Sequence, residues 1–145
     1  MSNPTNNYIG SFHFRVHVEG ITAPINSFFK VSSLTSSEEG VDMMHGNDRS
    51  VRKMSGRQDW QDLEMERYYE GMDELYAWRQ RIVDGHFDAR TVRVDYLRAD
   101  GSVARSMALI ECWPIKWVLP ECDAMGSHIA VEKVNLAYDS VLMLA

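Results

Sequence analysis

The sequence has no long apolar run, and this absence excludes the commonest kind of membrane protein. No uninterrupted hydrophobic stretch among the 145 residues approaches the roughly 20 that a membrane helix needs. The first seven residues are polar and carry no apolar segment behind a basic start, so no secretory signal is visible. We therefore expect a protein that is assembled in the cytoplasm and does not bind membranes.

Positive charge and cysteine are also scarce. Fifteen Lys and Arg residues oppose 21 Asp and Glu, and the formal net charge is -6. A nucleic-acid-binding surface needs clustered positive charge against the phosphate backbone, so the overall charge argues against that role. The only cysteines are Cys112 and Cys122. In a reducing cytoplasm such thiols are more often small apolar side chains than a disulfide.

Recognisable catalytic motifs are missing as well. There is no Gly-x-Ser-x-Gly, no Cys and His signature and no glycine loop that would cradle phosphate. His13 and His17 share a strand face, but no carboxylate or cysteine pair stands at ligand spacing. His45 lies between Asp42 and Asp48, yet loops rich in Asp, Asn and Gly form turns far more often than they hold ions. We predict no catalytic residue, no metal and no cofactor.

What the sequence does contain is enough apolar material for one core, arranged largely with a period of two. Hydrophobic residues make up 45% of the chain and aromatics 10%, which suits a single domain over residues 1–145. In residues 11–18 every second side chain from Phe12 to Val18 is apolar, which is typical of a half-buried strand. Further strands are predicted at 27–34, 41–44, 59–67, 92–96, 103–112 and 129–138, with 140–144 continuing the last one or capping its end.

The period changes once along the chain. Leu75, Trp78 and Ile82 recur at spacings of three and four, which predicts one amphipathic helix lying on a sheet. Gly85 is a natural C-cap for this helix. Large aromatic side chains usually supply buried area, so three tryptophans are predicted to belong to the core: Trp78, Trp113 and Trp117.

These elements predict a mainly β protein, an antiparallel β-sandwich or small barrel with one flanking α-helix. Pro114 has no amide hydrogen to donate, so we expect it to break the strand that precedes it. Residues 1–8 are predicted to form a flexible N-terminal arm. The polar and basic stretch 46–57, with its glycines, is predicted to be an exposed loop or hairpin tip.

Four segments carry more specific information. The last third reads Trp-Pro-Ile-Lys-Trp at 113–117 and, after a loop, Ile-Ala-Val-Glu-Lys-Val-Asn-Leu-Ala-Tyr at 129–138. Earlier segments read Phe-His-Phe-Arg-Val at 12–16, Ser-Val-Arg-Lys-Met-Ser-Gly at 50–56 and Ala-Trp-Arg-Gln-Arg-Ile-Val-Asp-Gly at 77–85. In this order they resemble the tail tube proteins of contractile phages and phage-tail-like injection systems, and they span nearly the whole chain.

The resemblance implies a structural protein. Six copies would form a ring whose subunits pool strands into a continuous inner β-barrel, and rings would stack into a hollow tube inside a contractile sheath. The implied partners are further copies of the chain, the sheath protein, the baseplate or spike and tube-terminating proteins, with cargo in the lumen. Pairing edge strands around a ring removes their liability to aggregate, so the implied assembly is physically consistent.

Under this resemblance three surfaces acquire roles. The helix is expected to face the sheath, the stretch 46–57 to contact the next ring, and carboxylates on alternating strands to line the lumen and repel anionic cargo. The residues expected at these surfaces are Asp73, Glu74 and Asp84 on the helix, Glu64, Glu66 and Asp95 in the lumen, and Arg49, Arg52, Lys53, Met54 and Arg57 between rings.

Three other interpretations stay open. The chain could be a secreted, ring-forming tube protein of type VI secretion, which shares the fold. It could instead be a monomeric β-barrel that binds a small ligand in its interior, or an enzyme with a His and Asp site around His45. Oligomeric mass separates the last two from the ring-forming proteins, since each of them predicts a monomer or dimer.

Overall fold

The computed structural model of the chain describes residues 9–10, 13–21, 28–43 and 52–144, and for 39, 41–43 and 52–58 it describes the backbone alone. Residues 1–8, which the sequence predicts to form a flexible arm, lie outside this range.

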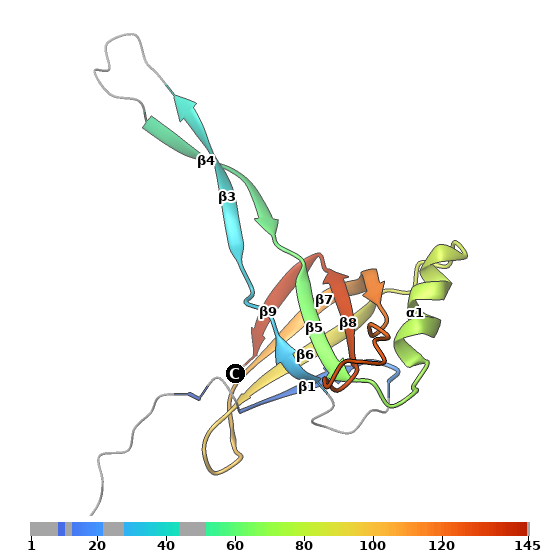
Figure 1. Cartoon of the computed structure of the whole chain (residues 1–145). Coiled ribbons are helices and arrows are strands. Elements are labelled where there is room, and N and C mark those ends of the chain that lie inside the picture. Colours follow the sequence, from blue (N-terminus) through green and yellow to red (C-terminus); the bar gives the residue numbers. More distant parts are fainter. Residues whose placement is uncertain (1–8, 11–12, 22–27, 44–51, 145) are drawn as a thin grey trace, which may run out of the picture.

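Within these residues the chain forms one helix and nine strands, and the paired strands are antiparallel (Figure 1). Seven strands form one sheet in the order β1-β6-β7-β8-β5-β2, with β9 also paired to β7, and β3 and β4 form a separate ribbon. The predicted mainly β class with one flanking helix is confirmed. The elements are β1 (Phe14–Val18), β2 (Phe28–Val31), β3 (Ser36–Met43), β4 (Arg52–Trp60), β5 (Leu63–Tyr68), α1 (Glu74–Val83), β6 (Arg90–Leu97), β7 (Val103–Val118), β8 (Val131–Ala137) and β9 (Ser140–Leu144).

The long strand β7 joins the two halves of the sheet. Its first part lies between β6 and β9, and its second part pairs with β8. β8 and β9 follow one another along the same edge of β7, with Trp113 opposite Ala137 and Ile110 opposite Ser140. The inner faces of both halves contribute to one hydrophobic core, which includes Leu109 from one half and Val134 from the other.

The expected strand break at Pro114 is wrong, because β7 continues to Val118. Pro114 lies opposite Leu136, and the register shifts only after it. Among the described residues this part of β7 pairs on one side alone, and proline is tolerated where its missing N–H would face an open edge. Glu111, with a φ of 58°, precedes this segment and marks the irregular point where β7 changes partners.

The three tryptophans that were predicted to belong to the core differ in how deeply they are buried. Trp78 is fully buried in the core, and Trp117 is half-buried, packing on the core with its ring 5.2 Å from that of Tyr76. Trp113 departs from the predicted core position, since it is half-buried and packs edge-to-face against the exposed ring of Phe87. Its neighbour Pro114 takes the buried side of the strand instead.

The helix ends as the sequence predicts. Gly85 has a φ of 91°, which side chains other than glycine rarely adopt. The amide of Gly85 donates to the carbonyl of Ile82 at 3.1 Å, and that of His86 donates to the carbonyl of Arg81 at 2.9 Å. These are the paired bonds of a Schellman motif, so the C-cap at Gly85 is confirmed.

The ribbon of β3 and β4 stands out from the rest of the molecule (Figure 1). Three predictions need correction here: the strand at 41–44 is part of the longer β3, the strand at 59–67 is divided between β4 and β5, and 52–57 is strand rather than loop. Pairing such as Gly40 with Ser55 supplies backbone hydrogen bonds whatever the side chains are, so the polar composition concealed the strand.

Candidate assembly surfaces

The helix presents a mixed surface. Asp73 is exposed and makes no capping hydrogen bond from its side chain, and exposed Asp84 accepts a hydrogen bond from the Gln80 amide at 2.9 Å. Exposed Tyr76 and Val83 lie on the same helix. The surface predicted to face the sheath therefore carries exposed carboxylates beside apolar side chains.

Glu74, the third predicted residue of that surface, turns partly inward. Its carboxylate lies 3.4 Å from Nη1 of the fully buried Arg67. Arg67 also donates from Nε to Glu132 at 2.7 Å, and Trp117 donates from Nε1 to the second oxygen of Glu132 at 2.9 Å. This buried polar cluster ties the N-terminal end of α1 to β5 and β8.

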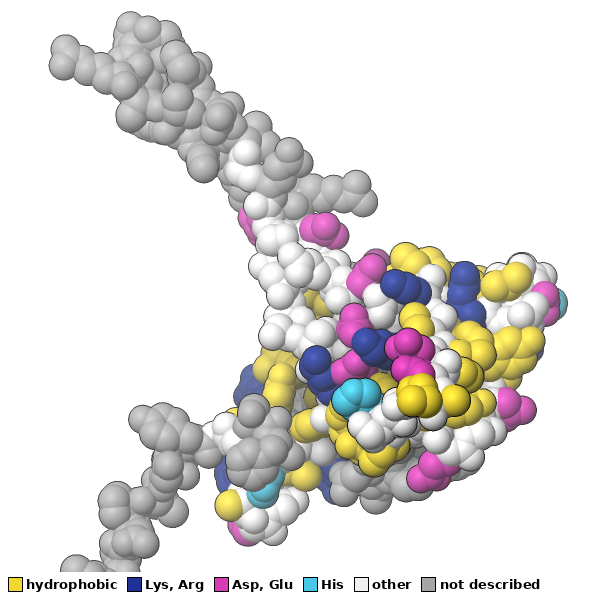
Figure 2. Space-filling model, in the orientation of Figure 1, with side chains coloured by type: hydrophobic (Ala, Val, Ile, Leu, Met, Phe, Trp, Pro, Cys, Tyr) yellow, Lys and Arg dark blue, Asp and Glu magenta, His cyan; other side chains and the backbone are white. Residues whose placement is uncertain are grey.

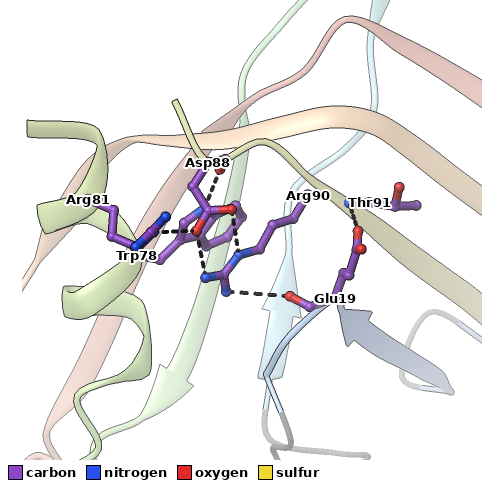
Figure 3. A network of polar contacts seen from close by, with 6 residues as sticks. All are labelled: Glu19, Trp78, Arg81, Asp88, Arg90 and Thr91. Carbon is purple, nitrogen blue, oxygen red and sulfur yellow. Dashed lines mark hydrogen bonds and ion pairs between the residues drawn. The ribbon is translucent and has the colours of Figure 1, made fainter. Parts of the chain in front are cut away.

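A second polar cluster lies at the other end of the helix, around Asp88 (Figure 3). The carboxylate of Asp88 accepts hydrogen bonds from Arg81 at 3.0 Å and from two nitrogens of Arg90 at 2.8 and 3.3 Å. Its backbone carbonyl accepts a hydrogen bond from Trp78 Nε1 at 2.7 Å. The hydrogen bonds and charge of Arg90, with a smaller contribution from Arg81, lower the pKa of Asp88 despite its partial desolvation.

Glu66, predicted for the lumen, is the centre of a row of ion pairs that crosses three strands. Its carboxylate lies 3.5 Å from Lys30 on β2 and 3.2 Å from Lys133 on β8. Glu64 is half-buried on the same strand, two residues away. Basic and acidic side chains also intermix across the face of the body seen in Figure 2.

Asp95, the other lumen candidate, is 1% exposed and is surrounded by cations. Arg15 lies 3.5 Å away on β1 and Arg93 3.2 Å away on β6. Ser106 donates a hydrogen bond to its carboxylate at 2.6 Å, and His17 stands at 3.7 Å. Neither Asp95 nor Glu66 is therefore a bare carboxylate in the single chain, and strand alternation did not indicate their basic neighbours.

The residues predicted between rings belong to the projecting ribbon. Arg52, Lys53, Met54 and Arg57 all lie on β4, whereas Arg49 lies outside the described residues. The backbone of β4 places the first three at the end of the strand that is farthest from β5 (Figure 1).

A groove lies on the outside of the sheet. It has a volume of about 650 Å³ and lies between the segment 119–130 and strands β2, β5 and β8, with Phe29, Leu119 and Ile129 among its apolar walls. A barrel that binds a ligand inside would need a hollow interior, but the inner faces here are filled by core side chains. This arrangement does not favour the ligand-binding alternative.

The described residues give little support for a catalytic site or a metal site. They contain no group of three or more His, Cys, Asp or Glu side chains placed to hold a metal ion. The predicted cluster around His45 falls outside them, since His45 and Asp48 are not described and Asp42 is described by its backbone alone. Burial raises the pKa of the free Cys112 thiol to about 12, which disfavours the nucleophilic thiolate at neutral pH.

The decisive comparison is with protein families. The family model described as T4-like virus tail tube protein gp19 matches residues 10–142. The chain belongs to this tail tube family. Its role is therefore structural, as part of the tube of a phage tail or phage-tail-like particle. No curated protein matches the chain by sequence.

Solved structures show the same fold in related particles. A chain of an extracellular contractile injection system, in the PVC sheath-tube complex in its extended state, has a TM-score of 0.84 and 22% identity, with 97% of this chain and 94% of that chain covered. A chain of the anti-feeding prophage baseplate has a TM-score of 0.78 and 19% identity, with coverages of 99% and 97%. Hcp1 from Flavobacterium johnsoniae has a TM-score of 0.63 and 17% identity, with coverages of 91% and 94%.

A membrane-spanning helix is not found in the part of the chain that the structure describes, since its helix is neither long nor apolar enough.

Proposed function

We propose that six copies of this tail tube protein form a ring and that the rings stack into the hollow inner tube of a contractile phage tail or phage-tail-like injection system, inside a sheath. The observation that carries the proposal is the projecting ribbon. β3 and β4 pair with each other and with no other strand of the described chain. An isolated two-stranded ribbon is marginally stable in water, so it needs a partner surface, and another copy of the chain can supply one.

The open edges of the main sheet support ring formation. Among the described residues β9 pairs with β7 alone, along one of its edges, and its exposed apolar side chains include Leu142, Met143 and Leu144. An edge strand that is both unpaired and apolar invites pairing with another chain. In a closed ring of identical subunits each open strand edge pairs with the next copy, so no copy keeps an unpaired edge.

The helix and the ribbon supply the remaining contacts of the proposal. Asp73, Glu74 and Asp84 bear the charge that α1 offers to the sheath, and the basic residues of β4 contact acidic surface on the next ring. Similar chains come from a sheath-tube complex, a baseplate and a tube-terminating cap, which supports sheath, baseplate and terminator proteins as partners. The proposal includes no catalytic step and leaves the lumen free for cargo.

A secreted ring protein of type VI secretion is the second candidate, because Hcp1 shares the fold. Its lower TM-score of 0.63, against 0.84 for the sheath-tube chain, favours the tube of a permanent particle. Sheath and baseplate genes beside this one would support the first candidate.

Sedimentation of the purified chain tests ring formation. Six copies of the 16.7 kDa chain give a species of about 100 kDa, and higher concentration should drive stacking into faster species. A sample that stays monomeric across the micromolar range argues strongly against self-assembly of this kind.

A further inference from the structure

The contact between Glu74 and Arg67 ties the N-terminal end of the helix to the sheet, whereas the C-terminal half of the helix needs other contacts to fix its orientation. Leu75 and Trp78 are its only buried residues, and Asp73 contributes no side-chain cap. The helix packs mainly against the single strand β7. An amphipathic helix with so narrow a buried stripe can rock about its axis unless other groups hold it.

Arg90, at the start of β6, contacts the helix in two ways (Figure 3). Its guanidinium lies over the ring of Trp78, 4.8 Å from the ring centroid. It also donates hydrogen bonds from two nitrogens to the carboxylate of Asp88. That carboxylate accepts a further hydrogen bond from Arg81, and the backbone carbonyl of Asp88 accepts one from the indole N–H of Trp78. Both links therefore lead from one guanidinium to α1.

The same guanidinium reaches the end of β1. Its Nη1 donates to the carbonyl of Glu19 at 3.4 Å, and the carboxylate of Glu19 accepts the amide of Thr91 at 3.0 Å. Gly20 follows with a φ of 80°, and a Cβ placed there would lie 3.5 Å from Arg90 Nη1. The helix, β6 and the turn after β1 thus meet at Arg90.

We propose that Arg90 is a positioning residue that fixes the orientation of α1 on the sheet and so presents the outer surface of the helix to the sheath. The first part stands on the contacts alone, whereas the sheath part rests on the proposed function. Asp88 acts with Arg90, because its carboxylate holds the guanidinium over the ring of Trp78 while it accepts a hydrogen bond from Arg81 on the helix.

A lysine at this position would keep the charge but lose both geometric features. Its ammonium cannot hold a carboxylate through two parallel N–H groups, nor stack as a plane on an indole. Arg90→Lys should therefore loosen the helix without unfolding the domain. We expect amides in residues 74–86 to exchange about tenfold faster with deuterium, while those of β8 keep their protection.

Arg93→Lys is the matched control. Arg93 lies on the same strand and pairs with Asp95, away from the contacts that Arg90 makes. Arg81→Gln is a second test variant, because Arg81 is exposed and its loss removes the contact between Arg81 and the Asp88 carboxylate while the bond from Trp78 to the Asp88 carbonyl stays. It keeps the test informative if Arg90→Lys does not fold, and it should accelerate exchange in the last turn of the helix.

The experiment combines hydrogen exchange on the purified chain with co-sedimentation of preformed tubes and the sheath protein of the same particle. The proposal predicts faster exchange in α1, unchanged tube formation and sheath binding weakened about tenfold for Arg90→Lys, with no change for Arg93→Lys. Unchanged exchange in α1 for both Arg90→Lys and Arg81→Gln overturns the positioning role, whatever the chain assembles into. Faster exchange with unchanged sheath binding overturns the link to the sheath. If the wild-type chain forms no rings, the proposed function fails, while the exchange result still decides whether Arg90 positions the helix.

Discussion

Arg67 and Glu132 form an ion pair in which neither side chain is exposed, with Nε and Oε1 separated by 2.7 Å. The second oxygen of Glu132 accepts the indole N–H of Trp117, whereas Nη2 of Arg67 has no hydrogen-bond partner among the described residues. Two buried charges are costly to desolvate, and their attraction offsets that cost only when both are present. The pair therefore makes each residue dependent on the other.

Breaking this pair should be far more harmful than replacing it. We expect Glu132→Ala to lower the free energy of unfolding by about 3–5 kcal/mol, because the buried Arg67 charge loses its shortest ion pair and keeps only the longer contact with half-buried Glu74 at 3.4 Å. The double variant Arg67→Met with Glu132→Leu should recover most of that loss. Urea unfolding of the single and double variants measures both values, and equal losses in the two would show that charge burial is not the cause.

Truncation of the helix anchor should also destabilise the domain. Trp78→Ala removes a fully buried ring and the surface on which Arg90 lies, so we expect a loss of roughly 3–5 kcal/mol and largely insoluble protein. Tyr76→Ala on the same helix is the control, since Tyr76 is exposed. A soluble, cooperatively unfolding Trp78→Ala protein would contradict the position of this ring in the core.

The cluster around Asp88 predicts a pH dependence. The folded-state pKa of Asp88 lies below its usual 3.8, chiefly because of Arg90. The ionised carboxylate therefore adds stability above about pH 4, and this contribution is lost as the pH falls through the lowered value. Asp88→Asn should be less stable than wild type at neutral pH, with the difference shrinking below pH 4. Thermal unfolding from pH 7 to pH 2.5 measures it, and a constant difference would exclude this origin.

Charge reversal on the ribbon should separate folding from stacking. Arg52→Glu together with Lys53→Glu leaves the main sheet untouched, but like charges placed across an interface can cost several kcal/mol. We expect normal circular dichroism and an absence of tubes in electron micrographs. Arg98→Glu, at an exposed turn of the main body, serves as the control. Tubes of unchanged length in the double variant would place the stacking surface elsewhere.

A charge on the open edge should block ring closure. Leu142 is 55% exposed on β9, so Leu142→Lys removes little from the core while it places a solvated ammonium where another copy would pair. We predict a folded monomer by analytical ultracentrifugation. Rings that form at the wild-type concentration would show that β9 does not lie at the interface.

Periodicity was sufficient for the main elements. The alternation around Val16 and the spacing of Leu75, Trp78 and Ile82 predicted β1 and α1, because burial on one face imposes these periods. It failed for the ribbon, since among the described residues β3 and β4 pair only with each other, and strands outside the main sheet need no apolar alternation toward its core. The predicted strand break at Pro114 was wrong for a related reason, since a proline at an open strand edge does not lose a hydrogen bond for want of its amide hydrogen.

The polar clusters were harder to predict, though one signal was present. Glu132 shares its strand parity with Val134 and Leu136, so a charge stood at a position where the alternation required burial. Arg67 follows Leu63 and Met65 with the same parity on β5. Two opposite charges at apolar positions indicate a buried pair, but their contact depends on the register of β5 and β8, which no local pattern supplies.

The position of Asp95 and Glu66 in the lumen stays a prediction, but their basic neighbours could not be predicted from the sequence. Asp95 lies against Arg15 and Arg93, and Glu66 lies against two lysines. The total charge of a chain does not show which face carries the charged side chains, because pairing between distant strands decides how these side chains are distributed.

Electron microscopy of the chain co-expressed with its sheath tests the central claim most directly. The account predicts sixfold rings stacked into a hollow tube, with the ribbon of β3 and β4 between successive rings and α1 on the outer wall. A chain that remains monomeric in the presence of sheath and baseplate proteins would contradict it.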